Sequence, residues 1–296
     1  MIPILNREIE IDSASFRDPS GHVFHYKDKI YRVINEDTFS LIKELKDKNI
    51  LTELIDNGFL IPTDILSKKD SIYEELKSCF PAEQNFLSHR KIPMITYPYE
   101  WSYSMLVDAA ILTLKLQLAL IRKGYSLKDA TAYNIQFINC KPVFIDILSI
   151  EKSPRLDIWI AYGQFCQMFL YPLLLNKFKN FDIKGYYLSN INGMDIQEVT
   201  RIFGISGSLR PLLFLDIFLP YLLGKKAVAN TDRLKSFISK EKISSKPQEI
   251  NLRRLLHKIE SKLKYRYKKG YWINYMSEHT YPAESEREKN PLLKDF

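Results

Sequence analysis

The sequence is poor in residues that several large classes of protein need. Its 296 residues include ten glycines, which disfavours folds that hold cofactors on glycine-rich loops. Its three cysteines, Cys79, Cys140 and Cys166, are odd in number and widely spaced. They predict neither a disulfide framework nor a CxxC metal site. We expect them to be buried free thiols in a reducing cytoplasm.

Long apolar runs are also scarce, and the opening residues give no reason to expect a signal peptide. The first eight residues show no basic stretch followed by an apolar core, so no signal peptide is expected. The longest apolar runs, residues 112–121 and 211–223, contain polar residues and are too short to span a bilayer. Hydrophobic residues nevertheless make up 46% of the chain and aromatic residues 13%. We therefore expect a soluble cytoplasmic protein with a large packed core.

Positive charge is concentrated near the end of the chain. The net charge is +8, yet residues 225–269 hold fifteen Lys and Arg against four Asp and Glu, a local charge of +11. Such a segment fits an acidic partner, which could be nucleic acid, a phosphorylated substrate, an anionic membrane or an acidic protein. A solvated helix face is an equal alternative, because lysine-rich helices are common without any such partner.

The first hundred residues predict a small mixed lobe. Two β-rich runs, residues 22–26 and 30–34, read as a hairpin. Asn35 has the character of a cap for a helix over residues 36–46. A second short helix over residues 51–57 is followed by Gly58 and a strand candidate at residues 59–62.

The remainder predicts a mostly helical lobe. A strand candidate at residues 92–97 precedes a long, largely buried helix that begins near Ser102 or Ser104 and ends at Gly124. Residues 135–138 and 142–145 then read as a short hairpin. Further helices are expected at residues 159–176 (kinked or ended by Pro172), 195–203, 209–223 and 252–267, with a linker at residues 244–247.

One spacing in this second half carries chemical information. Asn134 follows Asp129 by five positions, and Asp146 follows Asn134 by twelve, at the end of an apolar run. Kinase-type phosphotransferases use this order: the first Asp orients the accepting hydroxyl, and the Asn and the second Asp hold magnesium on the nucleotide phosphates. We therefore predict Asp129 as the catalytic residue and Asn134 and Asp146 as metal ligands, with ATP and Mg²⁺ as candidate cofactors.

The residues expected to bind the nucleotide phosphates match the kinase pattern less well. Gly21 is the only glycine near the start that could serve a phosphate loop. Arg32 lies where a strand lysine is expected, with Glu36 or Glu44 as candidate partners, but its planar fork differs from a lysine point charge. Tyr97 and Glu100 lie where a kinase hinge would pass, and they could form one wall of an adenine pocket.

Structural alternatives stand beside each of these assignments. Asp129 could cap a helix or pair with Lys128 or Arg122, and Asn134 could belong to an ordinary turn. The aromatic cluster around Tyr97 could be core packing between two lobes.

Several segments together resemble a group of bacterial proteins known as SAM-dependent methyltransferases, some of them called nodulation proteins. The resemblance covers most of residues 15 to 205 and is carried by residues 15–21, 30–32, 95–101, 127–137, 142–146 and 159–166. In that family this segment is an N-terminal domain that precedes the methyltransferase domain. Residues 272–289 look like the bridge into the second domain, and no Asp-x-Gly-x-Gly-type loop follows a strand in this chain. The resemblance thus implies a methyltransferase partner and no SAM binding by this chain alone.

These observations predict an α+β, two-lobed protein-kinase-like fold of the aminoglycoside-phosphotransferase type. The expected regions are a small α+β lobe (1–100), a helical lobe with the Asp129, Asn134 and Asp146 loop (101–232), and a basic helix and tail (233–296). The first functional hypothesis is an accessory domain of a methyltransferase system that binds a substrate or partner, with weak or no phosphotransfer. The alternatives are an active ATP- and magnesium-dependent small-molecule or sugar phosphotransferase, and an interaction module that docks an acidic partner through residues 225–269.

Overall fold

The protein is described from a computed structural model, which defines residues 9–12, 21–27, 29–222 and 244–264. The chain divides into two compact units, residues 1–264 and 265–296. The second unit lies outside the described residues. All elements discussed below belong to the first unit.

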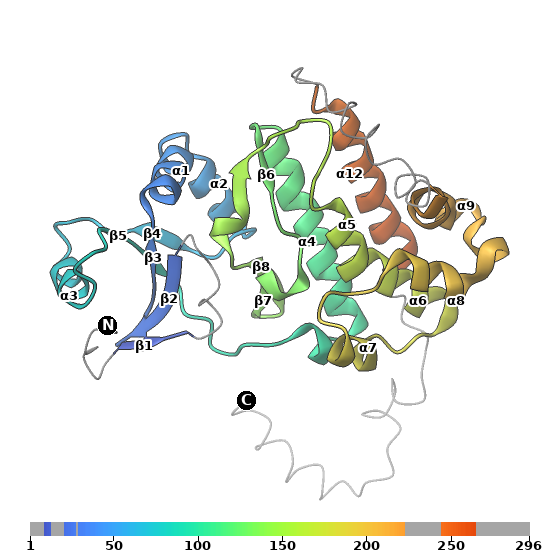
Figure 1. Cartoon of the computed structure of the whole chain (residues 1–296), viewed down its shortest axis with the longest axis horizontal. Helices are drawn as coiled ribbons and strands as arrows, with labels where there is room; N and C mark the ends of the chain where they lie inside the picture. The colour runs from blue at the N-terminus through green and yellow to red at the C-terminus, as the bar shows by residue number, and fades with distance from the viewer. Residues whose placement is uncertain (1–8, 13–20, 28, 223–243, 265–296) are drawn as a thin grey trace, which may run out of the picture. The chain divides into compact units, whose positions relative to one another are not determined.

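The fold is α+β, with a five-stranded antiparallel sheet at the start of the chain (Figure 1). The strand order is β1-β2-β3-β5-β4. The strands are β1 (Ile9–Ile11), β2 (Gly21–Tyr26), β3 (Lys29–Ile34), β4 (Thr63–Ile65) and β5 (Asn85–His89). Helices α1 (Glu36–Asp47) and α2 (Ile50–Asp56) connect β3 to β4, and α3 (Ser71–Cys79) connects β4 to β5.

The two faces of this sheet have different neighbours because side chains alternate along each strand. Phe24, Tyr31 and Phe86 share one face and form an apolar cluster with Tyr73 and Leu76 of α3. The opposite face carries alternate residues such as Ile34 and Leu87, which belong to the main core of the molecule. This second face is the one turned toward the candidate site.

Local sequence patterns predicted part of this region correctly. The β2–β3 hairpin is confirmed, and so is the cap of α1, where the side chain of Asn35 accepts a hydrogen bond from the Thr38 amide. The predicted strand at residues 92–97 is wrong: this segment is irregular, with Met94 70% exposed and Ile95 50% exposed. The strand at residues 59–62 is reduced to one bridge, Leu60 with Phe144. The strands that complete the sheet are instead β4 and β5.

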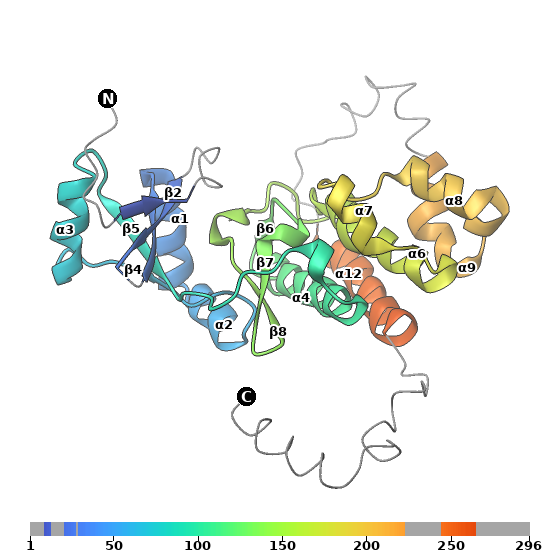
Figure 2. The same ribbon diagram turned by 90° about the horizontal axis from the view of Figure 1, so that it is seen from below.

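The second half of the described chain is mostly helical, around the long helix α4 (Tyr103–Ile121) (Figure 2). Its other helices are α5 (Tyr162–Phe165), α6 (Tyr171–Lys179), α7 (Ile183–Ser189), α8 (Ile196–Ser208), α9 (Pro211–Leu213) and α12 (Lys246–Lys258). Three π-helical segments, Cys166–Leu170, Phe214–Phe218 and Ile259–Leu263, adjoin these helices. Short 3₁₀ turns occupy Pro98–Glu100, Ala132–Asn134 and Ile147–Ser149.

Helix α4 is the central helix of this region. Ser102 caps it as predicted, by accepting a hydrogen bond from the Met105 amide. By length and composition alone α4 could cross a membrane, but 61% of its most apolar window is buried inside the protein. Core helices pass the same test, so the hydropathy of α4 is explained by its packing. Helix α12 runs beside it (Figures 1 and 2), and Gln117 of α4 donates to Gln248 of α12.

Two two-stranded sheets lie between the five-stranded sheet and the helices (Figures 1 and 2). Strands β7 (Ile135–Ile138) and β8 (Lys141–Phe144) form the predicted hairpin. Its turn places Asn139 and Cys140 at positive φ. Strand β6 (Tyr125–Leu127) precedes that hairpin in the sequence and pairs with strand β9 (Ile150–Lys152), which follows it. The Ile61 amide donates to the Phe144 carbonyl, which ties the hairpin to the segment between α2 and β4.

Three helix boundaries differ from the predictions. The helix predicted from residue 159 starts with α5 at Tyr162 and continues past Pro172 to Lys179, because a π-helical segment precedes the proline. Residues 246–247, predicted as part of a linker, form the first turn of α12, where proline is well tolerated. That helix also packs on α4 within the first compact unit.

Candidate functional site

A cleft of about 380 Å³ lies between the sheet and the β7–β8 hairpin. It is lined by Arg32, Asn134 and Asp146. All three were predicted from the sequence, although Arg32 is about a hundred positions from the other two. Its remaining lining is mainly aliphatic and histidine side chains: Val23, His25, Ile30, Ile61, His89, Ile92, Ile95 and Ile145, with Asp12 and Arg90.

Strand register explains why these side chains meet. In antiparallel pairs, directly opposed residues project on the same face of a sheet. Val23 is opposite Arg32, His25 is opposite Ile30, and Ile30 is opposite His89. The face not covered by α3 therefore supplies one wall of the cleft.

Arg32 and Asp146 join the two walls directly. The Arg32 Nη1 donates to Asp146 Oδ1 at 2.9 Å, and both side chains are largely shielded, at 13% and 23% exposure. The other carboxylate oxygen, Oδ2, accepts from the Ser149 hydroxyl at 2.7 Å. Asn134 donates its amide to the same Ser149 oxygen at 3.2 Å. The two predicted metal ligands thus belong to one hydrogen-bonded network that contains a guanidinium.

Backbone bonds fix the loop between β6 and β7 that carries Asp129. The Ala130 amide donates to the Gln164 side chain at 2.6 Å, and the Lys128 amide donates to the Ser149 carbonyl at 2.9 Å. The Ile145 amide donates to the Asn134 carbonyl, which holds Asn134 beside Asp146. Asp129 itself is half-buried and is not among the described residues that line the cleft. Its catalytic role stays a prediction.

Tyr97 and Glu100 lie in the segment that leads into α4. The Glu100 carboxylate accepts from the Tyr97 amide at 2.7 Å, and the Tyr97 ring stacks on Tyr99 with centroids 5.4 Å apart. Neither residue is among those that line the cleft in the described part of the chain. Trp101 is buried against Phe137, whereas Tyr97 is 44% exposed, so core packing accounts for Trp101 but not for Tyr97.

Gly21 has a structural reason to be glycine. It starts β2, and a Cβ there would lie 1.9 Å from the Val33 carbonyl oxygen. Close approach of β3 therefore requires the absence of a side chain. Residues 13–20, which precede it, lie outside the described residues.

The partners predicted for Arg32 are wrong. Glu36 accepts instead from the Asn85 side chain. Glu44 of α1 accepts from Lys152, Lys48 and Tyr125, and these hydrogen bonds lower its pKa to about 2. Because Tyr125 is in β6 and Lys152 in β9, Glu44 ties α1 to the β6–β9 pair.

His89 is a cleft residue that sequence reasoning missed. It ends β5, and its Nδ1 lies 2.9 Å from the buried Thr63 hydroxyl of β4. Burial and then the charge of Arg32 lower its pKa to about 3, against the opposing effect of Asp146. Two solvent-shielded atoms at the cleft, His89 Nε2 and Arg32 Nε, have no hydrogen-bond partner within the described residues. Only the pairing of three strands places them together, so no local pattern could have found them.

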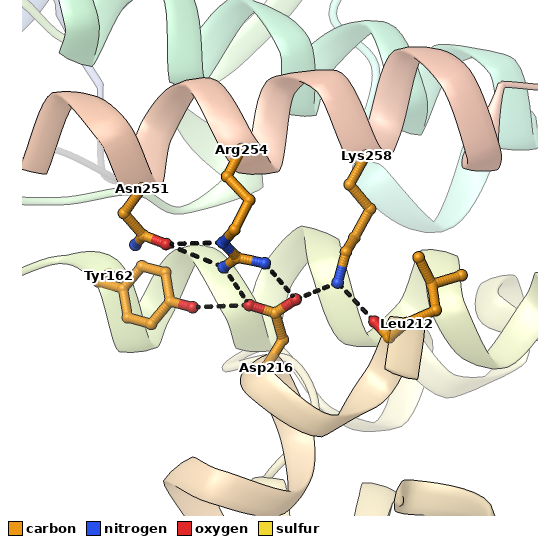
Figure 3. Close-up of polar contacts among 6 residues, drawn as sticks. All are labelled: Tyr162, Leu212, Asp216, Asn251, Arg254 and Lys258. Atoms are coloured by element: carbon orange, nitrogen blue, oxygen red, sulfur yellow. Dashed lines mark hydrogen bonds and ion pairs between the residues drawn. The ribbon is translucent and has the colours of Figure 1, made fainter. Parts of the chain in front are cut away.

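A second polar cluster is buried in the helical region (Figure 3). Asp216, fully buried, accepts from Arg254 through both oxygens, from Lys258 and from Tyr162. Burial by itself would raise the Asp216 pKa, but hydrogen bonds from Arg254 and the charge of Lys258 outweigh burial and lower it. Two cations of the predicted docking segment therefore point inward. Residues 225–243 and 265–269 of that segment lie outside the described residues.

The three cysteines differ in exposure. Cys166 is buried, and burial raises the pKa of its thiol to about 12. Cys79 is half-buried, and Cys140 is exposed in the β7–β8 turn. The expectation that all three are buried is wrong, because a tight turn places Cys140 at the surface. All three are free thiols, as predicted.

Comparison with known proteins gives one informative relative. No model of a known protein family matches the chain. The chain is similar to the nodulation protein NoeA of Rhizobium meliloti (strain 1021), with 32% identity over 287 residues. This alignment covers 96% of the chain but only 58% of the length of NoeA. The chain thus resembles a nodulation protein over almost all of its own length.

Proposed function

We propose that the chain is a kinase-like accessory domain that binds a nucleotide in its cleft and serves a SAM-dependent methyltransferase, with weak or no phosphotransfer. The order of elements supports the kinase-like part. A hairpin whose second strand carries Arg32 is followed by a helix, and the sheet faces Asn134 and Asp146, with Asp129 five positions before Asn134 in the sequence. Protein kinases place their phosphate-binding lysine and metal-binding Asp and Asn in this order.

One observation carries the accessory role: the contact between Arg32 and Asp146. In an active kinase this carboxylate holds magnesium and the strand cation contacts phosphate. Here Arg32 Nη1 donates to Asp146 Oδ1 instead, and Ser149 takes the remaining carboxylate oxygen. A metal ion would have to displace a charge-assisted hydrogen bond, which is among the stronger polar contacts in proteins. Binding without metal is therefore favoured over phosphoryl transfer.

The methyltransferase link rests on the family resemblance and on the similarity to NoeA. The match leaves the rest of NoeA unmatched, since it spans 58% of that protein. A methyltransferase partner accords with this, and SAM is expected to bind the partner and not this chain. The acceptor would be a small molecule or glycan.

An active ATP- and magnesium-dependent phosphotransferase is the second candidate. The meeting of Arg32, Asn134 and Asp146 in one cleft favours it. In that reading Asp129 orients the acceptor hydroxyl, while Asn134 and Asp146 hold the metal.

Calorimetric titration with ATP separates the two candidates. The accessory domain should bind ATP in EDTA, with an affinity that magnesium changes little, and Asp146→Asn should still bind. The phosphotransferase should need magnesium, lose binding in Asp146→Asn and show γ-phosphate turnover that Asp129→Asn removes. Absence of binding at millimolar ATP would contradict both.

The methyltransferase link needs its own measurement. A preparation of the chain with its partners from the native cells should transfer labelled methyl groups from SAM. The chain purified alone after heterologous expression should show neither this activity nor SAM binding. SAM binding by the isolated chain, or a native preparation devoid of methyl transfer, would contradict the link.

A further inference from the structure

The cleft contains polar atoms whose bonding capacity is unused. His89 Nε2 and Arg32 Nε are shielded from solvent and have no partner within the described residues. Arg32 is opposite Leu87, two positions before His89, so the two side chains are diagonal neighbours on one face. Buried polar atoms without a partner are costly, which makes such a pair a candidate contact for a ligand.

The hydrogen-bond role of His89 follows from Thr63. The Thr63 hydroxyl lies 3.0 Å from the Ile61 carbonyl oxygen, which can only accept, so the hydroxyl donates its single hydrogen there. It then has to accept from His89 Nδ1, 2.9 Å away. A neutral imidazole that carries its hydrogen on Nδ1 has a lone pair on Nε2. His89 therefore offers an acceptor to the cleft.

Arg32 supplies the complementary donor. Its Nη1 donates to Asp146, whereas its Nε–H meets no acceptor in the described part of the chain. The charges of Arg32 and Asp146 compensate each other, which leaves the exposed Arg90 as the cation of the described lining that could meet a phosphate. The surrounding walls are aliphatic, with Val23 and Ile30 from the sheet and Ile145 from beyond the hairpin. A flat, neutral ring with adjacent donor and acceptor groups fits this surface better than a phosphate does.

We propose that His89 Nε2 and Arg32 Nε recognise the amino-bearing edge of an adenine-type base. The adenine amino group would donate to His89, and an adjacent ring nitrogen would accept from Arg32. Hypoxanthine has a carbonyl oxygen in place of the amino group, which would face the His89 lone pair. The inference rests on the proposed nucleotide binding and assigns its base specificity to two side chains.

ATP and ITP differ at this edge and are the direct test. A site that hydrogen-bonds a ligand amino group rejects the analogue that lacks it. ATP should bind the wild-type protein at least about tenfold more tightly than ITP in paired calorimetric titrations. Equal affinities would overturn the base assignment and leave nucleotide binding intact. Failure of both nucleotides to bind would contradict the proposed function itself.

Two variants locate the selectivity. His89→Asn can keep the contact with Thr63 through its amide nitrogen but lacks the Nε2 acceptor, so its preference for ATP should fall toward unity. Thr63→Val leaves every atom of the cleft lining in place and removes the group that fixes the imidazole tautomer, so the preference should fall in part. His257→Asn, an exposed histidine on α12, should keep the wild-type ratio. A wild-type ratio in His89→Asn, with an unchanged melting temperature, would overturn the inference.

Discussion

Arg32 and Asp146 are 114 positions apart in the sequence, and their side chains meet at 2.9 Å across the cleft. The first comes from the middle of β3 and the second from the residue pair that follows β8. Their contact joins the sheet to the hairpin and determines which charges the cleft offers to a ligand.

A double-mutant cycle should detect this contact as a coupling energy. Arg32→Met and Asp146→Asn, alone and together, should give a coupling of about 1–2 kcal/mol in urea unfolding, because the pair is shielded but not fully buried. The exposed pair Lys27–Glu75 is the matched control. Its coupling should stay below about 1 kcal/mol. Equal couplings for the two pairs would contradict the role given to Arg32.

Asp216 should matter more for stability than any surface charge. Asp216→Asn leaves Arg254 and Lys258 without their carboxylate in a shielded place, which should cost about 3–5 kcal/mol of unfolding free energy. Glu260→Gln, which removes an exposed partner of Lys115 at 3.7 Å, should change it by less than about 1 kcal/mol. Chemical denaturation of both variants gives the comparison. A small effect for Asp216→Asn would contradict the stabilising role given to this buried cluster.

Glu44 predicts a pH dependence of stability. Its pKa is about 2 in the folded protein and 4.5 as a free side chain, so its stabilising contribution is complete above pH 4.5 and disappears as the pH falls toward 2. The melting temperatures of wild type and Glu44→Gln should therefore differ most above pH 4.5 and converge near pH 2. Lys152→Met, which removes the leading cause of the shift, should reduce the difference. Parallel melting curves across this range would contradict the assignment.

The cysteines should react at very different rates. The Cys140 thiol is exposed in a turn, so iodoacetamide should label it in the folded protein. Cys166 is buried with a pKa of about 12, and only a thiolate is a good nucleophile. It should be labelled after unfolding only, as followed by peptide mass spectrometry. Labelling of Cys166 at a rate close to that of Cys140 under native conditions would show that its surroundings open.

Local patterns predicted the elements whose signals are local. The β2–β3 hairpin, the Asn35 and Ser102 caps and the β7–β8 hairpin all depend on residues within a few positions of one another. Strand β5 (Asn-Phe-Leu-Ser-His) was missed because it is short and half polar, and its place is fixed by its pairing with β3 and β4.

The same distinction holds for the site. Arg32, Asn134 and Asp146 could be found from type and spacing, and they line one cleft. His89, Thr63 and Ser149 could not be found, since their roles come from strand pairing and from the turn after β8. The direct contact of Arg32 with Asp146 was not predicted either. Spacing along the chain identifies candidate ligands but does not say which of them neutralise one another.

Photoaffinity labelling can show whether the nucleotide binds in this cleft. The protein would be irradiated with 8-azido-ATP in EDTA, digested, and its labelled peptides sequenced, with excess unlabelled ATP as the competition control. Label should appear, and be removed by ATP, on peptides that contain the cleft residues His89 to Ile95 or Ile145. Competed label confined to peptides remote from the cleft, or no competed label at saturating nucleotide, would contradict the account.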